Sequence, residues 1–99
     1  MEVTTDELAA AVGAYVLDVR RHEEWVEKRI PGVTLIPMDQ ITERIDEVPS
    51  EQRIYVVCAV GGRSGRVAEW LRQQGYDAVN VAGGTNLWVE EGRPFESGE

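Results

Sequence analysis

Residues 54–65 read IYVVCAVGGRSG, and they combine the most strand-like run of the chain with a glycine-rich turn. The run from Ile54 to Cys58 is rich in β-branched and aromatic residues and carries no charge, which predicts a strand in the middle of a sheet. After the turn, apolar residues recur on one helical face from Ser64 to Gln74, and Gly75 is placed to end that helix. A buried strand that leads through a tight turn into a helix is typical of an α/β domain.

The same alternation of short strands and helices extends over the whole chain. The stretch from Tyr15 to Val19 lacks the strict alternation of a one-sided strand, as expected for a parallel sheet covered on both faces. Thr4 and Glu7 have the spacing of a capping box at the start of a helix. We predict strands near Val3 and over residues 15–19, 33–36, 54–58 and 78–82, and helices over 5–12, 21–28, 38–48, 64–74 and from Thr85 or Asn86 through Trp88.

Length and composition fit one domain that spans residues 1–99. With 99 residues, 42% of them hydrophobic, the chain can bury one core, and a largely disordered state is excluded. The tail from about Gly92 is polar enough to fray. No apolar run approaches the roughly 20 residues that span a bilayer, and no basic segment followed by an apolar one opens the chain. We expect no membrane partner and a cytoplasmic location.

Charge and cysteine count exclude further classes of protein. Ten basic and 18 acidic residues give a net charge of −8, which would repel a nucleic-acid backbone. Cys58 is the only cysteine, so an internal disulfide is excluded, and with the single histidine, His22, it cannot supply a structural zinc site. We expect no metal, and Cys58 must serve either packing or chemistry.

The loop after Cys58 suits an anionic sulfur. In open α/β sheets, ligands bind beyond the carboxyl ends of the strands, which is where Cys58 lies. The glycines allow successive N–H groups to converge, and the following helix adds its positive end. Such surroundings, with a fixed positive charge at Arg63, lower a cysteine pKa from about 8.5. The sequence therefore predicts a nucleophilic Cys58 thiolate in a substrate-binding loop made of Ala59, Val60, Gly61, Gly62, Arg63 and Ser64.

Other interpretations of the loop fit its residues less well. A buried packing cysteine requires neither the glycine pair nor the arginine. A Walker A loop requires a lysine, which is absent here, and the Gly-x-Gly-x-x-Gly dinucleotide turn is absent too. We therefore favour chemistry at Cys58.

Four segments of the chain stand in the order and spacing of a known family, namely Leu17-Asp18-Val19-Arg20 with Glu24-Trp25, Ile30-Pro31-Gly32-Val33 with Ile36-Pro37, Cys58 to Ser64, and Val81-Ala82-Gly83-Gly84 with Trp88. Together they resemble the single-domain rhodaneses, a family of sulfurtransferases. They cover nearly the whole chain, and the Cys58 loop is the most diagnostic. The resemblance implies a five-stranded parallel sheet with helices on both faces. Arg29 departs from the family's usual histidine, and Ala59 and Val60 depart from its frequent polar residues.

The resemblance implies a thiosulfate sulfurtransferase-like enzyme. In this hypothesis Cys58 takes a sulfane sulfur from a donor such as thiosulfate or a persulfide and holds it as a persulfide. It then passes that sulfur to a thiol or cyanide acceptor, with Arg63 orienting the donor and with no metal or organic cofactor. The related phosphatases have five residues between cysteine and arginine, whereas four lie between Cys58 and Arg63 here, which disfavours phosphate.

Supporting roles are predicted for residues near the loop. Asp18 ends a strand at the edge of the sheet where Cys58 lies, and we expect it to hold the turn that follows. Arg20 and Glu24 are spaced to pair with each other. Arg66 either attracts an anionic donor or is simply solvated, and Gly83-Gly84 should bring the helix that carries Trp88 close to the site.

Two other functions remain open from sequence. The chain can be an interaction module in which Cys58 is incidental, although rhodanese-like modules of that kind typically lack the cysteine. It can also be a relay that takes sulfur from one protein and gives it to another, and the net charge of −8 would favour a basic protein partner.

Overall fold

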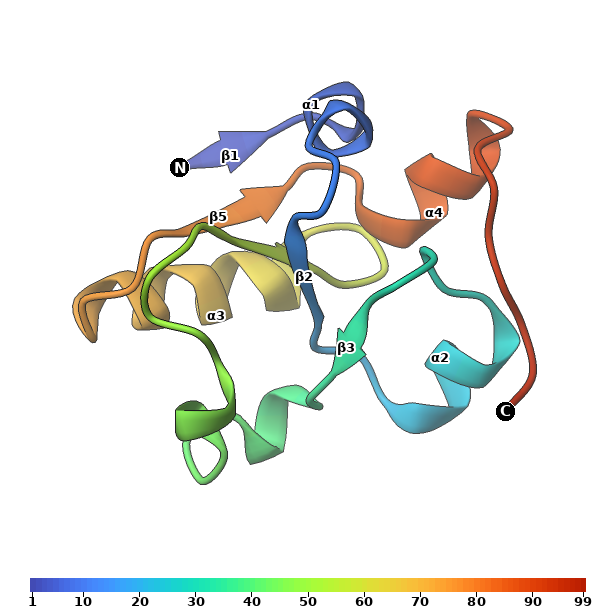
Figure 1. The fold of residues 1–99 in the computed structure, drawn as a ribbon. Coiled ribbons are helices and arrows are strands. Elements are labelled where there is room, and N and C mark those ends of the chain that lie inside the picture. Colours follow the sequence, from blue (N-terminus) through green and yellow to red (C-terminus); the bar gives the residue numbers. More distant parts are fainter.

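The computed structural model describes residues 1–99 and contains a single parallel sheet in the order β1-β5-β4-β2-β3 (Figure 1). Each strand pairs in parallel with its neighbour, so the expected five-stranded α/β architecture is confirmed. The strands are β1 (Glu2–Val3), β2 (Tyr15–Asp18), β3 (Thr34–Leu35), β4 (Ile54–Val57) and β5 (Ala78–Val81). The helices are α1 (Thr5–Ala10), α2 (His22–Glu27), α3 (Gly62–Gln73) and α4 (Gly84–Glu90), with two short 3-10 helices, η1 (Met38–Gln40) and η2 (Ile45–Glu47). None of the helices is both long and apolar enough to cross a membrane.

Helices cover both faces of the sheet, and β4 lies at its centre as the sequence predicts. Successive side chains of a strand point to opposite faces. Ile54, Val56 and Cys58 belong to one buried cluster with residues of α3, whereas Val57 packs in a second cluster with Leu8 of α1 and Trp88 of α4. In Figure 1, α3 lies on one side of β5 and α1 on the other. A strand buried on both faces explains the continuous apolar run of β4.

Local signals place the ends of the helices. Thr4 caps α1 by accepting a hydrogen bond from the backbone N–H of Glu7 at 3.1 Å, and the Glu7 carboxylate accepts from the Thr4 N–H at 3.0 Å. Gly75, with φ +96°, allows the chain to leave α3 while Tyr76 N–H donates to Leu71 O. α3 starts two residues before the predicted Ser64, because the chain turns helical directly after Gly61.

The prediction of one α-helix over residues 38–48 is wrong. The segment forms η1 and η2 separated by turns, although its apolar anchors Ile41 and Val48 are buried as expected. Four of the eleven residues are β-branched, and such residues destabilise an α-helix. Short 3-10 turns still place Ile41 and Val48 in the core. At the last helix, the predicted caps Thr85 and Asn86 lie inside α4, which is capped by Gly83 with φ +82°.

The C-terminal tail differs from the expectation that it frays from Gly92. Arg29 and Glu96 exchange two backbone hydrogen bonds at 2.8 and 2.9 Å, and Gly98 N–H donates to Val26 O at 2.7 Å. The Arg29 guanidinium lies 3.8 Å from the Trp25 ring centroid and donates to Gly98 O at 2.7 Å. The arginine at position 29 is therefore a structural residue that holds the tail.

Candidate active site around Cys58

Cys58 lies directly after β4, at the carboxyl edge of the sheet, and is only 1% exposed. The loop that follows curls around its sulfur. Gly61 N–H donates to Sγ at 3.1 Å, and the Ser64 hydroxyl lies 3.2 Å from Sγ. Gly61 has φ +124°, a conformation that L side chains rarely adopt, so the glycine is needed for this turn. Two of the six residues of the predicted loop, Gly61 and Ser64, thus contact the sulfur.

The surroundings of Cys58 favour its anionic form. Burial raises the pKa of the thiol, but hydrogen bonds from the Ser64 hydroxyl and from the backbone amides of Ser64, Gly61 and Val60 outweigh it, so the pKa lies below its ordinary value. Donors that converge on one sulfur stabilise negative charge there. The site can therefore hold a thiolate or another anionic sulfur species.

α4 fixes the first two residues of the loop. Thr85 N–H donates to Cys58 O at 2.9 Å, and Asn86 N–H donates to Ala59 O at 3.0 Å. A Cβ on Gly84 would lie 2.4 Å from Cys58 O, so only glycine permits this approach. The expectation that Gly83-Gly84 brings α4 to the site is confirmed, but Trp88 itself packs in the core and donates its indole N–H to Pro94 O at 2.7 Å.

Arg63 faces Glu24 of α2. Its guanidinium donates to both carboxylate oxygens of Glu24, at 2.8 and 2.9 Å. These hydrogen bonds are the main cause that lowers the pKa of Glu24 to about 2. The predicted pairing of Arg20 with Glu24 is wrong, and Glu24 instead neutralises much of the positive charge that the sequence assigned to the sulfur loop.

Arg20 pairs with Asp18 because both side chains are buried at the end of β2. The Asp18 carboxylate accepts from the Arg20 backbone N–H at 3.0 Å and from its Nη2 at 2.9 Å. Arg20 also donates to the carbonyl oxygens of Glu24 at 3.3 Å and Lys28 at 2.7 Å. Asp18 thus holds the turn after its strand, in the place the sequence predicts, and Arg20 ties α2 to the sheet.

Asn80 of β5 belongs to the site and was missed from sequence. Its Oδ1 lies 2.5 Å from the Ser64 hydroxyl, and its Nδ2 donates to Gly61 O at 3.2 Å and to Glu2 Oε2 at 3.1 Å. The available signal was a single polar residue inside the otherwise apolar run from Ala78 to Ala82. A polar side chain at a buried strand position needs partners, and here the loop supplies them.

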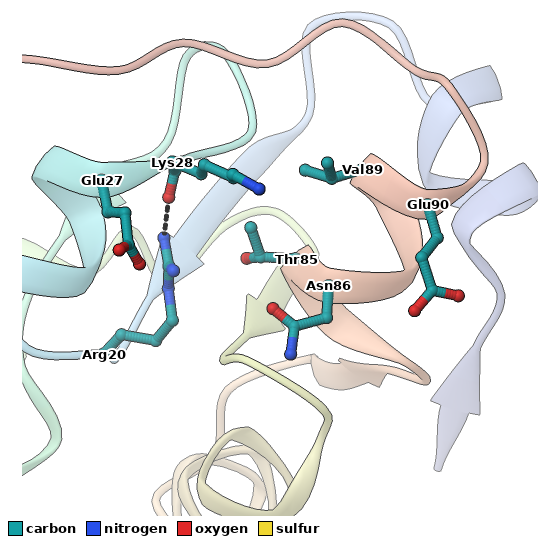
Figure 2. Close-up of a pocket in the computed structure, with 7 residues that line it drawn as sticks. All are labelled: Arg20, Glu27, Lys28, Thr85, Asn86, Val89 and Glu90. Carbon is teal, nitrogen blue, oxygen red and sulfur yellow. Dashed lines mark hydrogen bonds between the residues drawn. The ribbon is translucent and has the colours of Figure 1, made fainter.

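Two hollows flank the loop. The first, of about 470 Å³, is lined by Arg63 and Arg21 together with Val19, Pro37, Met38 and Asp39. The second, of about 280 Å³, lies between α2 and α4 and includes Thr85 and Asn86, the residues whose amides hold the loop (Figure 2). Cys58 lines neither hollow.

The side chains of two further candidates, Val60 and Arg66, are exposed. Val60 is 65% exposed at the surface of the loop. Arg66 is exposed, lines a shallow groove of about 140 Å³ with Met38 and Trp70, and forms no ion pair. No group of three or more His, Cys, Asp or Glu side chains is arranged to hold a metal ion.

Comparisons with known proteins identify what the chain is similar to. Residues 4–91 match the family described as Rhodanese-like domain. YtwF of Bacillus subtilis, provisionally named a sulfurtransferase, is 34% identical over an alignment of 97 positions that covers 94% of each chain. A sulfurtransferase of Allochromatium vinosum is 31% identical over 99 residues, 99% of this chain and 92% of that protein. The crystal structure of a rhodanese-related protein from Thermoplasma volcanium superposes with a TM-score of 0.91 at 33% identity over 96% of both chains.

Proposed function

This chain belongs to the family of rhodanese-like domains, and from that premise we propose that it is a sulfurtransferase that carries a sulfane sulfur on Cys58. The observation that carries the proposal is the cradle around Sγ, in which the Gly61 amide and the Ser64 hydroxyl face the sulfur. Such donors stabilise an anionic sulfur nucleophile before the reaction, and the backbone amides of the loop stabilise an anionic persulfide after it.

The proposed reaction has two displacement steps. The Cys58 thiolate attacks the outer sulfur of thiosulfate, the S–S bond of the donor breaks, and sulfite leaves with the electron pair. Cys58 then carries a persulfide anion. In the second step a thiolate or cyanide attacks the outer sulfur, which leaves as an organic persulfide or thiocyanate, and the Cys58 thiolate returns. No net oxidation of the protein occurs, and the cycle needs no group other than donor and acceptor.

Arg63 is proposed to receive the anionic donor. It lines the hollow of about 470 Å³ beside the loop, where Arg21 supplies a second guanidinium. Thiosulfate is a dianion, and guanidinium groups form paired hydrogen bonds with oxyanions. Arg66 lies outside this hollow and is not included in the donor site. Because Cys58 is only 1% exposed, we propose that the loop moves to admit the donor and the acceptor to Sγ.

The experiment is an intact-mass measurement after brief incubation with thiosulfate and, separately, with a cysteine persulfide. A gain of one sulfur atom that cyanide reverses, and that the Cys58→Ser variant does not show, is the expected result. The donor that loads the larger fraction of the protein identifies the preferred class of donor.

Absence of a mass gain with both donors would contradict small-molecule sulfur transfer. Incubation with a cysteine desulfurase and cysteine then separates the remaining functions. Loading in that arm alone would indicate a protein-to-protein relay, and no loading in any arm would favour an interaction module.

A further inference from the structure

The Ser64 hydroxyl lies between two atoms that compete for its proton. Its Oγ is 3.2 Å from Cys58 Sγ and 2.5 Å from Asn80 Oδ1. A hydroxyl has one proton and can donate to only one of them at a time. Ser64 is fully buried and Asn80 is 4% exposed, so the two acceptors compete for this proton in a site shielded from solvent.

The side-chain amide of Asn80 is held in one orientation. Its Nδ2 donates to Gly61 O at 3.2 Å and to the Glu2 carboxylate at 3.1 Å, and both of these partners are acceptors. Turning the amide over would place Oδ1 against two acceptors, so Oδ1 remains the atom that faces Ser64. Asn80 therefore acts on Ser64 as a fixed hydrogen-bond acceptor.

Ser64 and Asn80 oppose the effect of the backbone amides on Cys58, because these two side chains fit the thiol better than the thiolate. In the thiol, S–H donates to Ser64 Oγ while the Ser64 hydroxyl donates to Asn80 Oδ1, and every group has a partner. In the thiolate, the sulfur draws the Ser64 proton, and Oδ1 then faces a hydroxyl oxygen 2.5 Å away without a proton between them. A buried acceptor left without a donor destabilises the form of the site that contains it.

A persulfide on Cys58 restores the hydrogen bond of the thiol form, in which Ser64 donates to Asn80 Oδ1. Its negative charge resides on the outer sulfur, and the sulfur bonded to Cβ becomes a weak acceptor. The Ser64 proton is then free to return to Asn80 Oδ1. The bare thiolate is thus the one form of the site in which Asn80 loses its donor.

We propose that Asn80 is a positioning residue that competes with Cys58 for the Ser64 proton and thereby favours the sulfur-loaded form of the site over the bare thiolate. The inference rests on the proposed persulfide chemistry and adds to it a residue outside the loop. Asn80 does not contact the sulfur in this arrangement. It acts on the sulfur through Ser64, and its Nδ2 also holds Gly61 O, a contact that the Ser64→Ala background leaves in place.

Other charged groups near the cradle are accounted for by their own partners. Arg63 of α3 is held by Glu24 of α2, and Asp18 at the end of β2 is held by Arg20. Glu2 of β1 reaches the cradle only through Asn80 Nδ2. The Glu2→Gln variant removes that charge while keeping an acceptor, which makes it the matched control.

The test measures the pH dependence of Cys58 alkylation by iodoacetamide, without any sulfur donor. Asn80→Leu, which keeps the size of the side chain, should lower the pKa of Cys58 by about one unit, and Ser64→Ala should raise it by about one unit. In the Ser64→Ala background, the Asn80→Leu change should no longer lower the pKa. Asn80→Val, which matches the flanking strand residues, provides a second variant with the same expectations, and thermal melts show which variants fold.

The double-mutant comparison decides the inference. Equal pKa shifts from the Asn80 substitution with and without Ser64 would overturn it, as would a Glu2→Gln shift as large as that of Asn80→Leu. A second readout is persulfide loading from a cysteine persulfide, whose equilibrium constant should fall about tenfold in Asn80→Leu. Wild-type protein that never gains sulfur would contradict the proposed function, whereas equal shifts would contradict the role of Asn80 alone.

Discussion

The guanidinium of Arg63 and the carboxylate of Glu24 meet across the space between α3 and α2, with Nη1 2.8 Å from Oε1 and Nη2 2.9 Å from Oε2. The geometry is bidentate, which is the strongest arrangement for this pair of groups. Glu24 thus holds Arg63 in place at the mouth of the loop and offsets its charge. The same contact has consequences for donor binding and for acid stability.

Donor binding should respond in opposite directions to the two residues. Arg63→Ala removes the positive charge that faces the donor and should raise the KM for thiosulfate about 3–10-fold, whereas Glu24→Gln leaves the charge of Arg63 unopposed and should lower that KM by a similar factor. Steady-state thiocyanate formation measures both. Arg53→Ala, which removes an arginine paired with Asp77 outside the site, should leave the KM unchanged. Changes in the same direction for Arg63→Ala and Glu24→Gln would contradict this account.

Acid should weaken the fold through Glu24. Its pKa falls from 4.5 to about 2 in the folded protein, so its contribution is complete above pH 4.5 and is lost as the pH falls toward 2. Because Arg63 is 35% exposed, the pair should contribute only about 1 kcal/mol at neutral pH. Urea midpoints measured from pH 6 to pH 2 should fall less steeply in Glu24→Gln than in the wild type. Parallel curves would show that the pair contributes nothing.

Gly84→Ala should damage both stability and activity. The new Cβ would lie 2.4 Å from Cys58 O and 2.7 Å from Ala59 O, which are backbone atoms that cannot turn aside. We expect a loss on the order of 3 kcal/mol and a melting temperature about 10–20 °C lower. Gly92→Ala is the matched control, since Gly92 also has positive φ but no atom within 4 Å of its added Cβ, and it should cost only about 1 kcal/mol. Equal losses would mean that the close approach of α4 to the loop is unimportant.

Hydrogen exchange should show that the tail is held. The amides of Glu96 and Gly98 donate to Arg29 O and Val26 O, so they should exchange about fivefold or more slower than the neighbouring amides of Ser97 and Glu99. Arg29→Ala removes the side-chain bond to Gly98 O and should reduce the protection of Gly98. Uniformly fast exchange from Gly92 onward would instead support the fraying expected from composition.

Local sequence patterns were sufficient for the central elements of this fold. The uncharged run from Ile54 to Cys58 identified the middle strand, and the glycine pair after it identified a loop that turns back on the cysteine. The Thr4–Glu7 capping box and Gly75 also marked helix ends correctly. These features depend on interactions between residues close in sequence, and such interactions can be read from spacing.

Tertiary structure decided the partners of the polar side chains. Arg63 and Glu24 are 39 residues apart, and Ser64 and Asn80 are 16 apart, so only the folded sheet brings each pair together. Arg20 was expected to pair with Glu24, four residues away, but Asp18 is buried beside it and takes the guanidinium. A buried carboxylate without a partner costs far more than an exposed one, and sequence does not show which carboxylate the fold will bury. The sequence by itself therefore determined that Cys58 follows the central strand and begins a glycine-rich loop. The packing of β2, β5 and α2 against that loop determined which charged and hydrogen-bonding side chains lie near its sulfur.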